Sequence, residues 1–178
     1  MTRHVMLDLE TLSSQKNAAI IQLAAVSFDA QTGAVYSEFN RFTNDIFGHV
    51  AADTVAWWMQ QDFAPQLGKL LQTSGVPTAQ ALADFCGWCS SQTIEAIWSH
   101  GATFDLPVVG SALAAAGLKT PWRYSAERDT RTLYALAPGG MPAVRSVAGT
   151  KHDALYDCHV QVKQVVGALA ALRSGLAK

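Results

Sequence analysis

Two acidic residues, Asp8 and Glu10, stand at the end of the first apolar segment of the chain, residues 4–10. An apolar segment of this length is typical of a buried strand, in which side chains alternate between the two faces. Both carboxylates therefore point to one side, where burial and mutual repulsion disfavour two negative charges. A divalent cation such as magnesium, which binds several oxygen ligands, would offset that cost. Many strands simply end in acidic residues, so the pair becomes informative only if the chain supplies further ligands.

Further candidate ligands follow two later segments. Asp105 comes after a short apolar segment, residues 97–99, and just before Pro107, a residue tolerated in the first turn of a helix. His152 and Asp157 stand at the start of a long C-terminal helical segment. Five positions correspond to about 140° around a helix. Both residues can therefore face one cleft only if His152 lies in the loop before the helix and Asp157 in its first turns.

The ordered set resembles the three motifs of the DEDDh 3′–5′ exonucleases, a group of the DnaQ-like superfamily on the ribonuclease-H-like fold. The motifs read Asp8-x-Glu10, His100-x-Ala102-x-Phe104-Asp105 and His152-x-Ala154-x-x-Asp157. Four further stretches are similar to the branch that includes phage-type exodeoxyribonucleases and adenylate-directed exoribonucleases, namely residues 17–20, 53–58, 121–122 and 128–133. Gly101 stands where the superfamily commonly has Asn, which leaves the catalytic positions intact.

The resemblance implies a metal-dependent 3′–5′ exonuclease that releases nucleoside 5′-monophosphates from single-stranded DNA or RNA by a two-metal-ion mechanism. Asp8, Glu10 and Asp157 would hold one Mg²⁺ ion, for which Mn²⁺ could substitute. Asp8 would bridge to a second ion, with Asp105 acting partly through bound water. His152 would be the general base for the attacking water, because imidazole titrates near neutral pH. The alternative is a catalytically silent module that binds nucleic acid or a partner, which the intact residue set disfavours.

Candidate substrate contacts lie beside these motifs. By resemblance, Thr11 and Leu12 would offer backbone N–H groups and an apolar wedge to the terminal nucleotide, although packing in a turn explains them equally well. Phe104 could stack on a base, but packing in the core is the simpler interpretation. Trp57 and Trp58 would point about 100° apart in a helix. One of them, with Trp58 as the candidate, could be a stacking platform; alternatively, one is buried and the other lies at a surface or dimer contact.

Two other groups of residues invite chemical interpretations. Cys86 and Cys89 have the Cys-x-x-Cys spacing of thiol oxidoreductases. They fall near the C-terminal end of an expected helix, however, whereas a reactive pair needs the N-terminal end, where the helix dipole lowers the thiol pKa. No two further residues complete a zinc site. Arg128 and Arg131 flank Asp129, and a solvated or structural ion-pair role is favoured there over a phosphate contact.

The expected elements begin with three strands and continue with alternating helices and strands. The strands are residues 4–10, 18–28, 34–43, 95–99 and 122–126, and the helices are residues 54–61, 79–89, 107–116, 130–137 and 153–172. Asp53, Thr78 and Asp129 are the expected N-caps of their helices. A meander followed by strand–helix units predicts an α/β fold with a mixed five-stranded sheet, in which strand 2 is antiparallel, flanked by helices. This arrangement agrees with the ribonuclease-H-like fold that the resemblance implies.

Length and composition predict one domain over residues 1–178, because the chain has 178 residues, of which 49% are hydrophobic and 15% charged. The net charge of −1 argues against a broad basic face for duplex DNA and favours a single-stranded 3′ end held by metal and local contacts. No signal peptide opens the chain, and no apolar stretch approaches the ~20 residues that cross a bilayer. Three cysteines do not form a disulfide framework. We therefore expect a cytoplasmic protein without membrane contact, and the resemblance suggests a homodimer.

Overall fold

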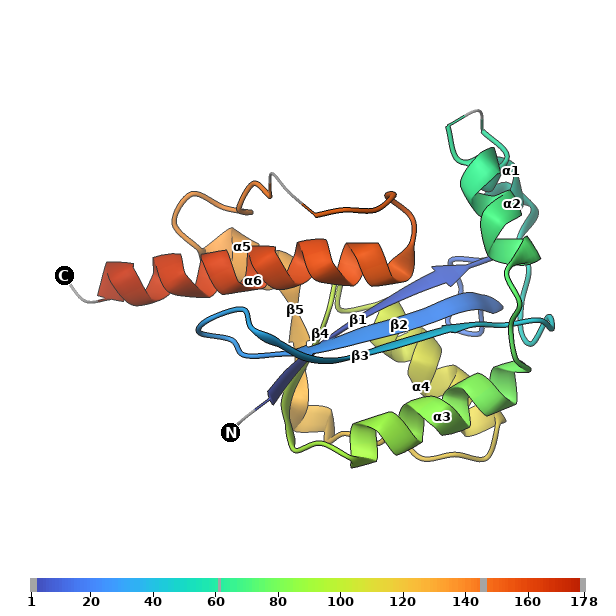
Figure 1. Ribbon diagram of the computed structural model, residues 1–178, viewed down its shortest axis with the longest axis horizontal. Coiled ribbons are helices and arrows are strands. Elements are labelled where there is room, and N and C mark those ends of the chain that lie inside the picture. Colours follow the sequence, from blue (N-terminus) through green and yellow to red (C-terminus); the bar gives the residue numbers. More distant parts are fainter. Residues whose placement is uncertain (1–2, 61, 145–146, 177–178) are drawn as a thin grey trace.

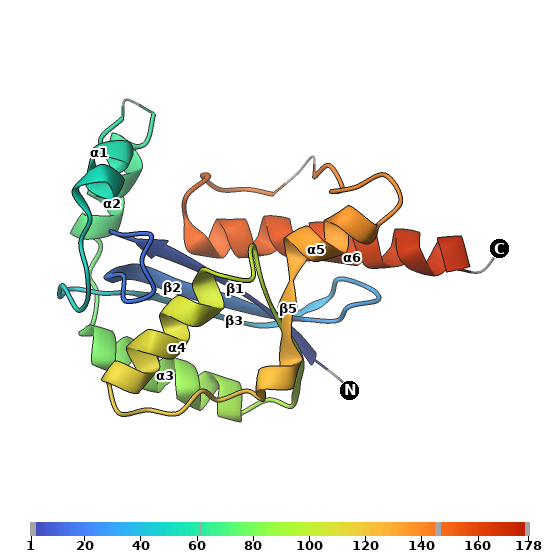
Figure 2. The same ribbon diagram turned by 180° about the vertical axis from the view of Figure 1, so that it is seen from behind.

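A five-stranded mixed sheet forms the centre of the computed structural model, which describes residues 3–60, 62–144 and 147–176 (Figure 1, Figure 2). The strand order is β3-β2-β1-β4-β5, and the predicted α/β fold with a mixed five-stranded sheet is confirmed. The strands are β1 Arg3–Thr11, β2 Ile20–Phe28, β3 Val35–Phe42, β4 Ile94–Ser99 and β5 Glu127–Asp129. The helices are α1 Ala52–Trp58, α2 Ala64–Gln72, α3 Thr78–Ser90, α4 Asp105–Ala115, α5 Thr130–Leu136 and α6 Ala154–Leu176, with a 3-10 turn at Tyr124–Ala126.

Strand β1 lies at the centre of the sheet and is paired on both edges. It runs antiparallel to β2, with Leu9 opposite Leu23, and parallel to β4, with Val5 opposite Ile97. Strand β2 also pairs with β3 in antiparallel orientation, so the predicted meander is confirmed. Pairing on both edges fixes the register of β1 and therefore the positions of the carboxylates at its end.

The two faces of β1 pack against different helices. Its odd-numbered residues Val5, Leu7 and Leu9 are buried with α3 and α4, whereas Met6 is buried with α5 and α6. Figure 1 shows α6 along one face of the sheet and α3 and α4 on the other. Because strand side chains alternate, Asp8 and Glu10 share the face of Met6. The paired carboxylates therefore point to the side of the sheet that α6 covers.

Helix α6 is anchored to the sheet by an apolar face and by one buried glutamine. Its buried residues recur every three or four positions, as in Ala154, Cys158, Val162, Val165 and Ala168. Gln22 of β2 is fully buried, and its Oε1 accepts a hydrogen bond of 3.0 Å from the backbone N–H of Ala154. Its Nε2 donates to Asn40 and to Asp153, at 3.1 and 3.3 Å. The start of α6 is thereby held at one place on the sheet.

Helices α1 and α2 stand together at the end of the sheet toward which β1 runs (Figure 1). Trp58 of α1 is packed with Leu67 and Leu70 of α2 in a separate apolar cluster. The Trp58 indole N–H also donates to the backbone carbonyl of Thr11, at 2.9 Å. This contact joins the pair of helices directly to the end of β1. Helix α2 was not among the elements expected from the sequence.

The fifth strand was predicted at residues 122–126, and this prediction is wrong. That segment contains the 3-10 turn, and the strand consists of Glu127–Asp129 instead. Trp122, the first residue of the predicted strand, is instead a buried core side chain. Its indole N–H donates to Glu127 at 3.0 Å. Pairing with β4 decides which three residues form the strand, and Ser99 lies opposite Asp129.

The predicted helix caps have different outcomes. Asp129 is confirmed as the N-cap of α5, because its carboxylate accepts hydrogen bonds from two backbone N–H groups of that helix. The prediction that Asp53 is the N-cap of α1 is wrong, because the helix begins one residue earlier and Asp53 lies in its first turn. Thr78 is also wrong, because it is the first residue of α3 and its hydroxyl donates to Asp45 at 2.6 Å. Gln61, the expected end of the first helix, lies outside the described residues. None of the described helices is long and apolar enough to span a membrane.

Replacing Gln22 by Met should lower the free energy of unfolding by about 2 kcal/mol, because it leaves the buried Ala154 N–H without its acceptor. Urea unfolding followed by circular dichroism measures this change. The exposed Gln15→Met variant is the matched control and should shift the free energy by less than about 0.5 kcal/mol. Equal stabilities of the two variants would contradict the anchoring role of Gln22.

Candidate active site

The five residues expected to carry the chemistry come together in one cleft. The cleft has a volume of about 640 Å³, and its walls include all five, namely Asp8, Glu10, Asp105, His152 and Asp157. They come from the end of β1, the first residue of α4, the loop before α6 and the first turn of α6. Residues separated by up to 149 positions in the chain thus share one site.

Three of these side chains form the tightest group of possible metal ligands. One ligand atom each of Glu10, His152 and Asp157 lies within 4.8 Å of the other two. Asp105 is buried, and hydrogen bonds from backbone N–H groups, including those of Leu9 and His100, lower the pKa of its carboxyl against the larger effect of burial. These bonds fix the orientation of the Asp105 carboxylate at the floor of the cleft.

Burial raises the pKa values of all four carboxyl groups, and the charges of neighbouring acidic residues raise those of Asp8, Glu10 and Asp157 further. The pKa of Glu10 is raised to about 8, chiefly by burial and then by the charges of Asp157 and other acidic groups. Burial likewise raises the pKa of Asp105 to about 7 and that of Asp157 to about 6. Asp8 has its pKa raised by burial and by the charges of Asp105, Glu10 and Asp157. Four oxygen donors that repel one another suit divalent cations with hard oxygen coordination, and the donor set therefore fits Mg²⁺ or Mn²⁺.

His152 is held in an unusual backbone conformation. Its φ is +62°, in the left-handed region that few residues other than Gly adopt. Its N–H donates to Asp157 Oδ2 at 3.0 Å, and its carbonyl accepts from Gln66 Nε2 of α2, also at 3.0 Å. His152 thus lies in the loop before α6, with Asp157 in the first turn, as the five-residue spacing predicted.

The imidazole of His152 is enclosed by three aromatic rings of the α1–α2 region. The ring centroids of Trp57, Trp58 and Phe63 lie 5.1, 5.9 and 4.6 Å from it, all in edge-to-face arrangements. Its Nε2 is buried without a hydrogen-bond partner. Burial, and then the charge of Lys151, lowers the pKa of this imidazole, so the ring is neutral near pH 7. A neutral imidazole next to carboxylates is able to accept a proton.

Three glutamines support the site, and the sequence analysis identified none of them. Besides Gln22 and Gln66, Gln161 of α6 is buried and donates from Nε2 to Asp8 Oδ1 at 2.8 Å. Gln161 lies four residues after Asp157, and this spacing places both side chains on one face of the helix. That spacing was a usable signal once the helix had been expected.

The four predicted substrate contacts differ in their exposure to the cleft. A smaller hollow of about 210 Å³ adjoins the cleft and shares Leu9, Glu10, Trp57 and Phe104 with it. Thr11 and Phe104 line this hollow. Leu12 is buried, and its N–H already donates to the carbonyl of Ala19 at 2.9 Å, so this residue has no free donor.

The two adjacent tryptophans differ in burial, although their rings are in edge-to-face contact with centroids 5.1 Å apart. Trp58 borders the smaller hollow, but it is only 1% exposed and its indole N–H donates to the Thr11 carbonyl. Trp57 is 38% exposed and borders both the cleft and the hollow. Of the two residues, Trp57 therefore has the geometry of a stacking platform.

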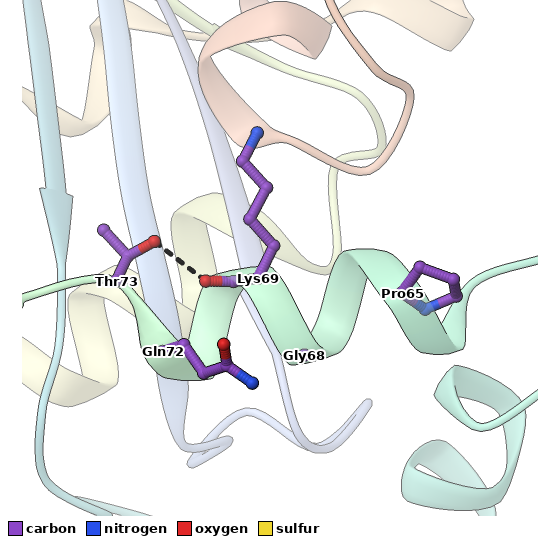
Figure 3. A pocket seen from close by; sticks show the side chains of 5 residues that line it. All are labelled: Pro65, Gly68, Lys69, Gln72 and Thr73. Atoms are coloured by element: carbon purple, nitrogen blue, oxygen red, sulfur yellow. Dashed lines mark hydrogen bonds between the residues drawn. The ribbon is translucent and has the colours of Figure 1, made fainter.

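Two other groups of described residues, a hollow on α2 and a pair of thiols, lack this combination of ligands. The hollow on the outer surface of α2, with a volume of about 490 Å³, contains neither a carboxylate nor a histidine, and Thr73 Oγ1 there donates to the Lys69 carbonyl (Figure 3). Cys86 and Cys89 are free thiols in the last turns of α3. Burial raises the pKa of both thiols, which is the opposite of what a redox pair requires.

The metal-free protein should lose stability as the pH rises from 5 to 8. Each carboxyl pKa is higher in the folded state than its ordinary value, which for Glu10 is 4.5 against about 8 in the fold. The folded state therefore binds more protons than the unfolded state in this range, and that contribution disappears as the pH rises. Urea unfolding in EDTA at several pH values measures the slope, which Glu10→Gln should reduce. A stability that increases toward pH 8 would contradict this.

Comparison with known proteins is consistent with this geometry. The family of 3′-5′ exoribonuclease Rv2179c-like domains matches residues 3–169. A search of curated proteins finds no match to this sequence.

Solved structures with similar folds have low sequence identity to this chain. Cell-death related nuclease 4 (CRN-4) is 14% identical with a TM-score of 0.67, over 96% of this chain and 64% of that one. E. coli Exonuclease I, solved with a dA16 oligonucleotide, is 16% identical with a TM-score of 0.69, over 98% of this chain and 42% of that one. Exonuclease X, solved with 5′ overhanging duplex DNA, is 16% identical with a TM-score of 0.61, over 94% and 91%.

The chain thus spans less than two thirds of the length of CRN-4 and of Exonuclease I. At identities this low, the similarity of the structures shows the fold alone. That fold is ribonuclease-H-like, in agreement with the resemblance to DEDDh exonucleases. The family match over nearly the whole sequence goes further: the chain belongs to the 3′-5′ exoribonuclease Rv2179c-like domain family.

Proposed function

We propose that this domain, over residues 1–178, is a divalent-metal-dependent 3′–5′ exonuclease that releases nucleoside 5′-monophosphates from single-stranded nucleic acid. The observation that carries the proposal is the meeting of four carboxylates and one imidazole in a single cleft. A silent binding module on the same fold would have no use for a buried set of repelling charges, because burying them lowers stability.

The residues of the chain have distinct roles in this proposal. Asp8, Glu10 and Asp157 would hold one Mg²⁺ or Mn²⁺ ion, and Asp8 and Asp105 a second. When bound, the two ions would neutralise the phosphodiester and stabilise the attacking and leaving oxygens. His152, neutral because burial lowers its pKa, takes the proton from the attacking water. Gln161 holds Asp8 in place, and the edge-to-face rings hold the imidazole of His152.

The substrate is a single-stranded 3′ end whose last nucleoside occupies the smaller hollow. Trp57 and Phe104 border both the hollow and the cleft and offer aromatic faces to a base. Thr11 lines the same hollow and contacts the terminal nucleotide. The family description supports RNA as substrate, whereas the solved complexes of Exonuclease I and Exonuclease X contain DNA. Rates on matched RNA and DNA oligonucleotides decide between the two.

His152→Ala should lower the cleavage rate by about 10²–10⁴-fold, because the attacking water loses its base. A 5′-labelled oligonucleotide incubated with Mg²⁺ should show a ladder that shortens stepwise from its 3′ end, and chelator should stop the reaction. His159→Ala is the matched control, since His159 contacts Glu38 at 3.1 Å and does not line the cleft. Activity that persists in chelator, or an unchanged rate in His152→Ala, would contradict the proposal.

Addition of Mn²⁺ or Mg²⁺ should raise the melting temperature of the protein, because the cations offset the repulsion among the four carboxylates. Asp8→Asn should melt at or above the wild-type temperature without metal, since it removes one repelling charge. The same variant should lose most of the metal-induced shift, whereas His152→Ala should retain it. Equal shifts in wild type and Asp8→Asn would place the bound ions elsewhere.

The assembly state follows only from the resemblance, which suggests a homodimer. Size-exclusion chromatography with light scattering distinguishes a dimer from a monomer of 19.1 kDa. A mass that stays at the monomer value at high protein concentration would contradict the dimer.

A further inference from the structure

Arg131 projects into the cleft from the first turn of α5, on the side of His100 and Asp105. The local structure explains why it lies there. Asp129 ends β5 opposite Ser99 of β4, and its carboxylate accepts a hydrogen bond from the Arg131 N–H at 3.1 Å. Thr130 Oγ1 lies 2.9 Å from His100 Nδ1. The strand pairing and this hydrogen bond hold the start of α5 next to the turn that follows β4.

The guanidinium of Arg131 lies against Gly101. A Cβ atom on Gly101 would be 3.6 Å from Arg131 Cζ and 3.8 Å from Nε, so any longer side chain at this position would compete with the guanidinium for space. The φ of Gly101 is also +124°, a conformation that side chains rarely adopt. The glycine that stands in place of the common Asn therefore makes room for Arg131.

The structure does not support the ion pair that the sequence suggested for Arg131. Among the described residues, no carboxylate oxygen lies within ion-pair distance of its guanidinium. The Asp129 oxygens are instead occupied by the N–H groups of Arg131 and Thr132 and by the Thr132 hydroxyl. A guanidinium has five donors in a planar fork, which matches the geometry of a phosphate.

The position of Arg131 along the cleft indicates which phosphate it meets. The smaller hollow is lined by Thr11, Trp57 and Phe104, and it shares Trp57 and Phe104 with the cleft. Arg131 and His100 line the cleft but not the hollow. A strand whose last nucleoside fills the hollow has its first phosphodiester at the carboxylates. Its next phosphate then continues along the cleft, away from the hollow.

We propose that Arg131, whose guanidinium packs against Gly101, binds the second phosphate from the 3′ end of the substrate and so holds the strand across the cleft. This inference rests on the proposed exonuclease function, and it assigns a specific residue to the recognition of a nucleic-acid strand. The contact also counters the repulsion between the incoming phosphates and the four carboxylates. Because the contact is made to the backbone, it applies to every base sequence.

The test combines a change in the protein with a change in the substrate. Single-stranded oligonucleotides, in matched RNA and DNA series, carry one uncharged methylphosphonate, either at the second or at the fourth phosphate from the 3′ end. In the RNA series the nucleotide on the 5′ side of that linkage is a deoxynucleotide, so that no 2′-hydroxyl attacks the methylphosphonate. Binding is measured by fluorescence anisotropy in Ca²⁺, and release of the first nucleotide by single-turnover kinetics in Mg²⁺. The variants are Arg131→Gln and the matched control Arg128→Gln, since Arg128 donates to the carbonyls of Ser125 and Glu127 and does not line the cleft.

Arg131→Gln should weaken binding of the unmodified strand about tenfold, the loss expected for one charge-assisted hydrogen bond. The slope of log K against log salt should fall by about 0.7, the value for one phosphate contact on a single strand. The methylphosphonate at the second phosphate should lower the binding affinity of wild type and of Arg128→Gln about tenfold. It should not lower the affinity of Arg131→Gln any further. The fourth-phosphate probe should affect all three proteins equally.

Equal penalties from the second-phosphate probe in wild type and Arg131→Gln would overturn the assignment, as would unchanged binding by a folded Arg131→Gln protein. The two arms also separate this inference from the proposed function. Absence of 3′ cleavage by wild type would overturn the function, while the binding cycle alone still decides whether Arg131 meets the second phosphate. Absence of any strand binding by wild type would overturn both.

Discussion

Repulsion among four carboxylates is the constraint on which the rest of the structure depends. Burial raises the pKa of each of these carboxyl groups, namely those of Asp8, Glu10, Asp105 and Asp157, and the charges of the other three raise the pKa of Asp8 further. A flexible arrangement would let them separate. The fold prevents this because each residue lies near the end of a strand or helix, and those ends meet beside the end of the central strand β1. The loss of stability at the site agrees with its proposed role in holding cations.

Helix α6 connects this acidic site to the apolar core. Its buried face packs against the sheet, and Gln22 bonds to the N–H of Ala154 at the beginning of the helix. The same turn of chain carries His152 and Asp157, which hydrogen-bond to each other. A shift of α6 along the sheet would therefore move both functional residues together. Helices α1 and α2 complete the site from the other side, through the aromatic rings around His152 and the bond from Gln66.

Much of the fold could be predicted because its signals are local. Apolar runs identified β1, β2 and β4, and alternating residues identified β3. The spacing of His152 and Asp157 correctly divided them between a loop and a helix. The fifth strand was misplaced because the apolar side chain of Trp122 packs in the core and does not belong to a strand. Pairing with β4 determines which residues form β5. Trp57 and Trp58 are alike in sequence, and only their packing against α2 buries one and exposes the other.

The sequence by itself determined the candidate chemistry of the protein, because the types of the candidate ligands, their order in the chain and the elements that carry them follow from residue types, periodicity and the resemblance to a family. Tertiary structure alone decided most of the supporting contacts, because they join residues far apart in the chain. Gln22 and Gln66 are ordinary glutamines until the sheet and helices bring each one to its partner, and the helical spacing of Gln161 from Asp157 does not identify Asp8 as the residue that it contacts. Arg131 and Gly101 likewise become a pair only when β5 places the start of α5 beside the turn after β4.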